Sequence, residues 1–193
     1  MIIKEPRWKS WIVETTTPLF TPEQCQKIID CGRRQKPQQA QVGMNKPEGG
    51  VDTKKRVTTI SWIPFEEMKP MYNDLNNFIQ KANENHFGFG DIQITENAQF
   101  TEYPEGGFYD WHMDCDVNMQ HEPPVRKISM TLLLNDPSEF EGGDLELMAP
   151  GKFAELKQGH AIIFASFLNH RVNPVTRGMR QSLVCWFGGK PFR

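Results

Sequence analysis

The sequence has few cysteines and no long apolar run, and both shortages limit what kind of protein it can be. Its 193 residues include only four cysteines, and their spacings match none of the paired patterns of zinc sites. No apolar stretch approaches the roughly 18 residues of a membrane span. The opening residues, MIIKEPRWKS, lack the apolar region of a signal peptide. We therefore expect a cytoplasmic protein with free thiols and no membrane partner.

An excess of positive charge is also missing. The chain has 22 Lys and Arg against 24 Asp and Glu, for a net charge of -2. It thus lacks the basic footprint of a nucleic-acid-binding protein, and we expect no nucleic-acid partner. Two short basic runs, Arg33–Arg34 and Lys54–Arg56, are predicted to be solvated surface, because runs this short do not form tails or patches.

Two helices are predicted in the first half of the chain. Thr21 can cap the first helix, with Pro22 in its first turn and Gln24 placed to close a capping box. Gly32 is expected to end that helix. The second helix is predicted from about residue 65 to residue 83, where apolar side chains recur with the 3.6-residue period of an amphipathic helix.

Outside the helices the pattern is mainly β. Residues 36–55 are polar and rich in Gln, Gly and Pro, which predicts a long loop. Short apolar or alternating segments predict strands at 57–63, 92–94, 98–103, 128–134, 145–147, 161–164 and 182–187. The predicted fold class is α+β, as one domain over residues 1–193. A helical layer at about 18–85 would support a mostly antiparallel β core, a sandwich or small barrel, at about 92–193.

His112 and Asp114 are the leading candidates for metal ligands. Residues two apart on a strand point to the same face, so one imidazole and one carboxylate would converge. A second imidazole would complete the 2-His-1-carboxylate triad, which leaves open positions on Fe(II). His170, which follows the strand predicted at 161–164, is the best candidate for it. Asp116 has the same strand parity as Asp114 and is a rival carboxylate.

Other histidines and one cysteine near these positions are weaker candidates. His121 and His160 are alternative ligands, whereas His86 is not expected to be one. Cys115 follows Asp114 directly and should point to the opposite face, as a buried thiol.

Arg180 is the candidate for holding a dicarboxylate cosubstrate. A 2-oxo diacid chelates iron through one end, and its far carboxylate suits a guanidinium, which binds carboxylate bidentately. Arg180 lies on the strand that follows the turn after His170, and Ser182 on the same strand should point the same way and add a hydroxyl donor. Arg177 competes for this role, but its place in the turn beside Gly178 predicts an exposed side chain.

Further motifs surround these candidates over the second half of the chain. They are Tyr103–His112, Arg126–Ser129, Glu141–Leu145, Phe164–Ser166, His170–Ser182 and Trp186–Arg193. Together they resemble the prolyl 4-hydroxylase-like branch of the Fe(II)/2-oxoglutarate dioxygenases, and most closely the bacterial and phage PKHD-type hydroxylases. The resemblance is dense over roughly 92–193 and extends weakly upstream through Arg56 and Trp62.

This resemblance implies a double-stranded β-helix, or jelly roll. It implies a reaction with Fe(II) and O2 that couples oxidative decarboxylation of 2-oxoglutarate to C–H hydroxylation, with ascorbate as a further cofactor of the family. Tyr103 would hydrogen-bond the cosubstrate, and Tyr109, Arg126 and Trp186 would line the substrate side. The loop at 36–55 would cover the substrate. The implied substrate is a prolyl residue of a peptide or protein, in a bacterial or phage-infected cell.

Two positions depart from the animal and plant prolyl 4-hydroxylases. Arg180 stands where those enzymes usually carry Lys, which fits the bacterial branch and weakens the case for a collagen-like substrate. Leu145 replaces a Thr that often assists the cosubstrate. Because likeness does not fix a substrate, two alternatives stay open: a hydroxylase of a free amino acid or small metabolite, and a catalytically silent metal-binding jelly-roll module. The acidic balance disfavours a nucleic-acid demethylase.

Overall fold

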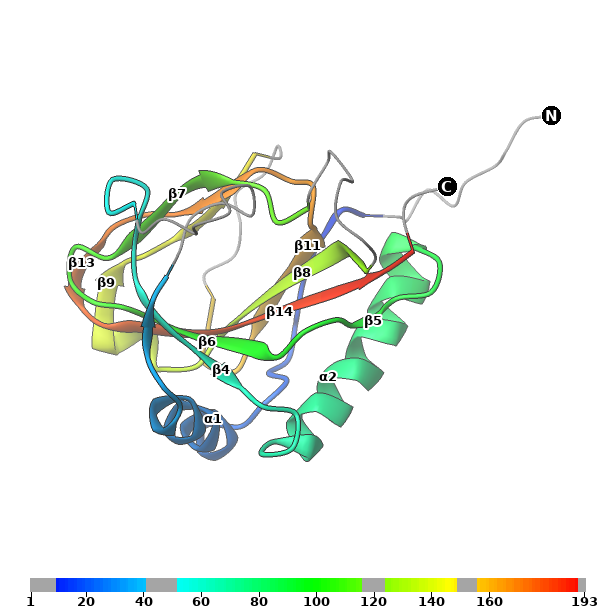
Figure 1. Ribbon diagram of the computed structural model, residues 1–193, viewed down its shortest axis with the longest axis horizontal. Helices are drawn as coiled ribbons and strands as arrows, with labels where there is room; N and C mark the ends of the chain where they lie inside the picture. Colours follow the sequence, from blue (N-terminus) through cyan, green and yellow to red (C-terminus); the bar gives the residue numbers. More distant parts are fainter. Residues whose placement is uncertain (1–9, 41–51, 116–123, 149–155, 191–193) are drawn as a thin grey trace.

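The computed structural model describes residues 10–40, 52–115, 124–148 and 156–190, and most of its regular structure is β-sheet (Figure 1). Its strands are β1 (Ile12–Glu14), β2 (Gln38–Gln39), β3 (Arg56–Val57), β4 (Thr59–Ile63), β5 (Gln93–Ile94), β6 (Ala98–Tyr103), β7 (Phe108–His112), β8 (Val125–Leu133), β9 (Phe140–Gly142), β10 (Leu145–Leu147), β11 (Ala161–Ala165), β12 (His170–Val172), β13 (Val175–Gly178) and β14 (Arg180–Gly189). A 3-10 turn, η2 (Pro137–Glu139), precedes β9.

Helix α1 (Pro22–Arg34) begins as the sequence predicts and ends later. The Thr21 side chain accepts from the Gln24 backbone, and the Gln24 side chain closes the capping box. The prediction that Gly32 ends the helix is wrong. Gly32 instead lets α1 lie directly on β6, because a Cβ at this position would be 2.4 Å from Cγ of Phe100.

Helix α2 (Lys69–Ala82) is shorter at its start than the periodicity predicts, since a turn occupies residues 65–67. Its apolar stripe is confirmed: the buried residues are Met71, Tyr72, Leu75, Ile79 and Ala82. A π-helical turn, η1 (Asn83–Phe87), continues it and ends at Gly88, whose φ is 71°. None of the helices among the described residues has both the length and the apolar content needed to cross a membrane.

The strands form two facing sheets and one ribbon, all antiparallel. The major sheet has the order β1-β11-β8-β14-β6-β4-β2, with β5 also pairing to β14; the minor sheet is β10-β12-β7-β3, and β13 pairs with β9. The single strand predicted at 57–63 is two strands, because β3 joins the minor sheet and β4 the major one. Strands that precede residue 92 therefore build both sheets.

The stretch predicted as a long loop at 36–55 contains the short strand β2, which pairs with β4. Residues 53–55 form a turn before β3. The middle of the predicted loop, 41–51, lies outside the described residues, as do two rival ligands of the sequence analysis, Asp116 and His121.

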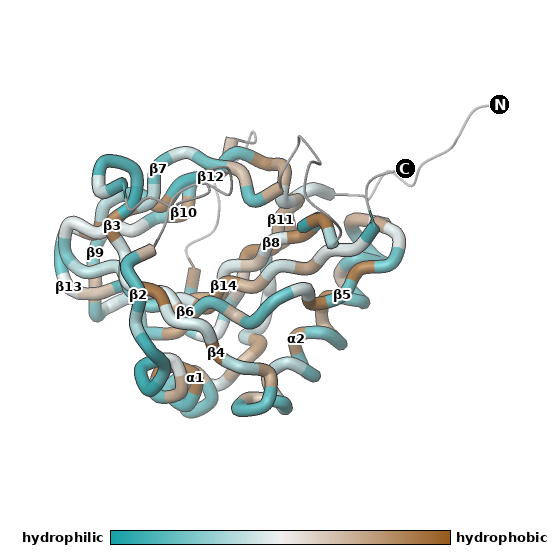
Figure 2. Tube along the Cα trace, in the orientation of Figure 1, coloured by the Kyte–Doolittle hydropathy of each residue, from teal (hydrophilic) through white to brown (hydrophobic). Residues whose placement is uncertain are grey.

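Alternation along the major sheet separates its core from its functional face. On β8, Ile128, Met130 and Leu132 are fully buried in the main apolar cluster with α1 and α2. Figure 2 shows hydrophobic segments along these helices and along the central strands. Ser129 alternates with them and points to the other face, toward the minor sheet. On β14, Arg180 and Ser182 also face that interior. The residues that carry chemistry thus line the space between the two sheets.

Candidate metal centre

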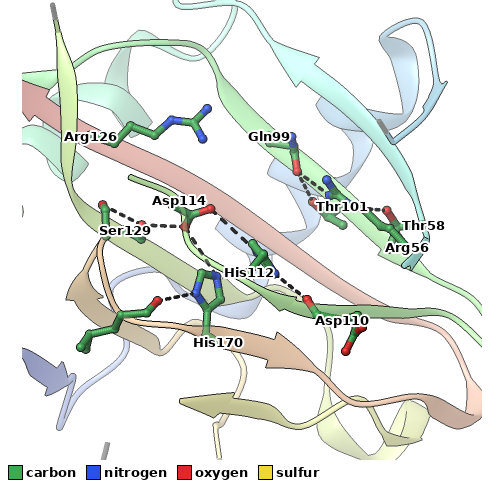
Figure 3. A network of polar contacts seen from close by, with 12 residues as sticks. Arg56, Thr58, Gln99, Thr101, Asp110, His112, Asp114, Arg126, Ser129 and His170 are labelled. Atoms are coloured by element: carbon green, nitrogen blue, oxygen red, sulfur yellow. Dashed lines mark hydrogen bonds and ion pairs between the residues drawn. The ribbon is translucent and has the colours of Figure 1, made fainter. Parts of the chain in front are cut away.

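Three predicted ligands converge between the sheets (Figure 3). His112 is the last residue of β7 and lies directly opposite His170, the first residue of β12. Asp114 Oδ1 is 3.9 Å from His112 Nε2, and Asp114 Oδ2 is 3.6 Å from His170 Nε2. Each of the three residues offers one ligand atom, and these three atoms lie within 4.8 Å of one another. Among the described residues, this group of side chains could hold a metal ion.

The route by which Asp114 reaches the centre differs from the prediction. Strand parity does not place it, because β7 ends at His112 and Asp114 lies in a bend beyond the strand. The backbone N–H groups of Asp114 and Cys115 both donate to the carbonyl of Ser166, each at 3.0 Å. This bend carries the carboxylate between the two imidazoles, and Cys115 is buried, as expected.

Both imidazoles are oriented for ligation by backbone carbonyls. Nδ1 of His112 is 2.7 Å from the carbonyl of Asp110, and Nδ1 of His170 is 3.0 Å from that of Leu168. A carbonyl only accepts, so each Nδ1 carries the hydrogen and each Nε2 keeps a lone pair toward the centre. His160 instead contacts the backbone of Thr15, so the structure does not place it with the ligands.

Ser129 fixes the carboxylate of Asp114, and Ser166 in turn supports Ser129. No role was predicted for either serine from the sequence. Ser129 Oγ donates to Asp114 Oδ2 at 2.7 Å, and Ser129 and Ser166 share a hydrogen bond of 2.9 Å. The signal that could have revealed Ser129 is a hydroxyl within the apolar strand Ile128–Leu134. A polar residue at a fully buried strand position needs a partner, and this partner is a ligand.

Electrostatics give the centre the ionisation state that a metal needs. Burial, and then the proximity of His170, lower the pKa of His112 to about 4. Burial alone would raise the pKa of Asp114, but His170, His112 and Arg126 and the Ser129 bond together lower it to about 2. His112 is therefore neutral and Asp114 ionised at neutral pH. Two imidazole nitrogens and one carboxylate fit Fe(II) and leave coordination positions open.

Arg180 lies in the same interior, and it forms no ion pair with a carboxylate of the described residues. It is 2% exposed, and its Nη1 donates to Ser182 at 3.2 Å, so the two side chains share a face as predicted. Its guanidinium is 5.5 Å from the ring centre of Tyr103, which is also buried. Burial lowers the pKa of Arg180, and the charges of Tyr103 and Asp144 oppose that shift. Arg177, in contrast, is exposed as expected and pairs with Glu141, although it lies in strand β13 and not in a turn, because this segment pairs with β9.

The residues expected on the substrate side surround the triad on other flanks. Tyr109 stacks on His112, with ring centres 3.5 Å apart. Arg126 makes two bonds to Glu96, of 2.7 and 2.6 Å, and its guanidinium lies 3.8 Å from the ring centre of Trp186. Nε1 of Trp186 is the one fully buried side-chain N or O atom of the described residues without a hydrogen-bond partner.

One residue of the predicted solvated run is in fact buried. Lys54 and Lys55 are exposed, but Arg56 is only 7% exposed. Its guanidinium lies 4.3 Å from the ring centre of Tyr109 and donates to Gln99. Run length alone could not reveal this, because Arg56 opens β3 and its side chain points between the sheets.

Sequence comparison gives this geometry a family context. Residues 98–188 match the family model described as the 2OG-Fe(II) oxygenase superfamily. A PKHD-type hydroxylase of Colwellia psychrerythraea is 43% identical over 110 residues, covering 48% of this chain and 49% of that protein. Another, of Acidovorax ebreus, is 34% identical over 93 residues, covering 46% and 41%. The chain thus spans less than half the length of these curated relatives.

Solved structures share the fold over nearly the whole chain. A prolyl-4-hydroxylase of Pseudomonas putida superposes with a TM-score of 0.67 at 21% identity, covering 94% of each chain. The viral collagen prolyl hydroxylase of Paramecium Bursaria Chlorella virus-1, in a 2OG complex, gives 0.72 at 16% identity, covering 94% and 97%. A Trichoplax adhaerens prolyl hydroxylase in complex with a hypoxia inducible factor peptide gives 0.68 at 18%, covering 93% and 84%.

The superfamily uses Fe(II), 2-oxoglutarate and O2, and the triad described above suits that iron. Residues 98–188 are therefore similar to the 2OG-Fe(II) oxygenase superfamily, and the chain is similar to PKHD-type hydroxylases over less than half of its length.

Proposed function

We propose that this protein is an Fe(II)- and 2-oxoglutarate-dependent hydroxylase that acts on prolyl residues of a peptide or protein. The observation that carries the proposal is the presence of a ligand-ready triad and the buried guanidinium of Arg180 in one interior. The two facing sheets are assigned as the double-stranded β-helix of this family. We also assign the protein to the cytoplasm of a bacterial or phage-infected cell.

His112, Asp114 and His170 would hold the iron. Bound there, Fe(II) would supply the chemistry that activates O2 for oxidation of a C–H bond. The protein's contribution is a fixed donor set: two carbonyls lock the imidazoles, and Ser129 locks the carboxylate. These supports fix the orientation of the donor atoms, so little reorganisation is needed when the metal binds.

Arg180 would bind the far carboxylate of 2-oxoglutarate. A buried charge is costly unless it is paired, and this cosubstrate brings the missing negative charge. Ser182 would add a hydroxyl donor, and Tyr103 lies beside the same guanidinium. Burial raises the pKa of Tyr103, and the charges of Arg56 and Arg180 oppose that rise.

Tyr109, Arg126 and Trp186 would form the substrate side. The guanidinium of Arg126 lies over the aromatic face of Trp186. A peptide substrate is supported by the Trichoplax adhaerens prolyl hydroxylase, which has the same fold and was solved in complex with a peptide. The alternative, a free amino acid, would use the same centre.

The test measures succinate after aerobic incubation with Fe(II) and 2-oxoglutarate, and mass spectrometry of prolyl peptides for the gain of one oxygen. The wild-type protein should form succinate, and His112→Ala should not. His86→Ala is the matched control, because His86 lies outside the triad. Absence of both succinate and anaerobic 2-oxoglutarate binding in the wild type would favour a catalytically silent metal-binding module.

A further inference from the structure

A second buried guanidinium lies between the sheets, in a polar cluster that no step above uses. Arg56 of β3 donates through Nε to Thr58 Oγ1 at 2.9 Å and through Nη2 to Gln99 Oε1 at 3.0 Å. Thr101, also on β6, donates to the same Gln99 oxygen at 3.3 Å. All four residues are buried. Figure 3 shows the cluster on one flank of the triad.

The charge of Arg56 has no counterpart within the part of the chain that the structure describes. Its polar partners, Thr58 and Gln99, are neutral, and no described carboxylate forms an ion pair with it. Burying an unpaired charge is costly, so buried charges in proteins are usually paired. Arg126, in contrast, is neutralised by Glu96, and Arg180 would be neutralised by the cosubstrate.

The unused polar groups of the cluster are hydrogen-bond donors. A guanidinium has five N–H groups, and Arg56 uses two of them within the described residues, which leaves three: both hydrogens of Nη1 and one of Nη2. Gln99 Oε1 accepts from Arg56 and Thr101. These bonds use only the oxygen of the Gln99 amide, and no hydrogen bond within the described residues uses its nitrogen. Neither nitrogen is among the inaccessible unpaired atoms of the described residues. Both can therefore be reached by a ligand that accepts hydrogen bonds.

The cluster is close to the metal centre. The Arg56 guanidinium lies 4.3 Å from the ring centre of Tyr109, whose ring stacks on His112 at 3.5 Å. Burial raises the pKa of Tyr103, and the charge of Arg56 opposes that rise, which is consistent with this placement. An anion bound by Arg56 would thus be about one aromatic ring away from an iron ligand.

We propose that Arg56 and Gln99 form a second anion-binding site, which selects substrates that carry a carboxylate near the C–H bond to be hydroxylated. This inference rests on the proposed function. Both carboxylates of 2-oxoglutarate have partners in that function, one on the iron and one on Arg180. The negative charge that Arg56 needs therefore comes from the substrate. The carboxylate could belong to an acidic side chain, to the end of a peptide, or to a free amino acid.

The test is a binding experiment without oxygen, with Mn(II) and saturating 2-oxoglutarate. Three probe pairs differ only by a carboxylate: the blocked dipeptides Ac-Pro-Glu-NH2 and Ac-Pro-Gln-NH2, N-acetyl-L-proline and its amide, and L-proline and its amide. Calorimetry gives the affinity of each. At least one carboxylate probe should bind roughly tenfold or more tightly than its neutral partner, the scale of a hydrogen bond to a charged group. The pair that shows the preference identifies the source of the carboxylate.

Two variants and one control assign any preference to this cluster. Arg56→Gln should remove the preference and leave 2-oxoglutarate affinity unchanged. Gln99→Glu keeps the size of the side chain and places a carboxylate against Arg56; it should remove the preference and raise the thermal stability. Arg177→Gln, which changes an exposed cation of β13, should leave the preference intact.

Two results would overturn the proposal. One is the absence of a carboxylate preference in every pair, whether both members bind alike or neither binds. The other is a loss of 2-oxoglutarate affinity in Arg56→Gln, since that would assign Arg56 to the cosubstrate. Neither result depends on turnover. A wild-type protein that makes no succinate would instead count against the proposed function, so the two failures are distinguishable.

Discussion

Ser129 offers the most direct test of how the protein prepares the metal centre. Its hydroxyl donates to Asp114 Oδ2 at 2.7 Å and is itself bonded to Ser166 at 2.9 Å. Ser129→Ala removes the Asp114 bond without removing a ligand. Ser166 does not replace it, because its described side-chain bond is to Ser129. The carboxylate would keep its place in the bend but lose the contact that fixes its rotation.

The expected loss follows from the type of bond. A hydrogen bond to a charged group contributes about 1.5–3 kcal/mol, and every 1.4 kcal/mol is about tenfold in affinity. Removing a residue that orients a ligand typically weakens metal binding by about 10–100-fold. These values agree, so Ser129→Ala should weaken Mn(II) or Fe(II) binding by roughly ten- to a hundredfold. The pKa of Asp114 should also rise, because the Ser129 bond contributes to lowering it.

Anaerobic metal titration of the apoprotein measures the effect. Ser166→Ala should lose less affinity, because the bond from Ser129 to Asp114 remains. Ser138→Ala, at an exposed turn position, should not differ from the wild type. If Ser129→Ala stays folded and binds metal within about twofold of the wild type, then Ser129 does not orient the ligand, and the preorganisation argument fails.

Three further predictions concern the cosubstrate, the pH dependence and the packing. Arg180→Ala should weaken anaerobic 2-oxoglutarate binding by about 1.5–3 kcal/mol, whereas Arg177→Ala should not; equal losses would divide the role between them. In the apoprotein, the pKa of His112 is about 4 when folded and 6.5 in the unfolded chain. The unfolded chain therefore binds the proton more tightly, and lowering the pH from 6.5 to 4 should cost roughly 3 kcal/mol of the free energy of unfolding. Urea titrations with a chelator should show this slope, and His112→Gln should flatten it. Gly32→Ala should destabilise the protein by about 1–3 kcal/mol, although Ala favours helices, because the added Cβ would lie 2.4 Å from Cγ of Phe100; a higher melting temperature would contradict the close packing of α1 on β6.

Residues that are close in the sequence were enough to predict where α1 begins and which face of α2 is buried. The Thr21 capping box and the apolar stripe of α2 depend only on residues a few positions apart, and both are confirmed. The boundaries that failed depend on distant contacts. Gly32 continues α1 because Phe100 packs against it, and the strand predicted at 57–63 divides because two different sheets pair with its halves.

The sequence by itself determined which atoms could ligate a metal, because the spacing of His112, Asp114 and His170 within recognisable motifs is a property of the chain. Only the tertiary structure decided how those atoms meet. Asp114 reaches the centre through a bend bonded to Ser166, and Ser129 reaches it from another strand. The same holds for Arg56, which belongs to a polar run in the sequence and to a buried cluster in the fold. Burial and charge compensation depend on segments far apart in the chain, so no local pattern encodes them.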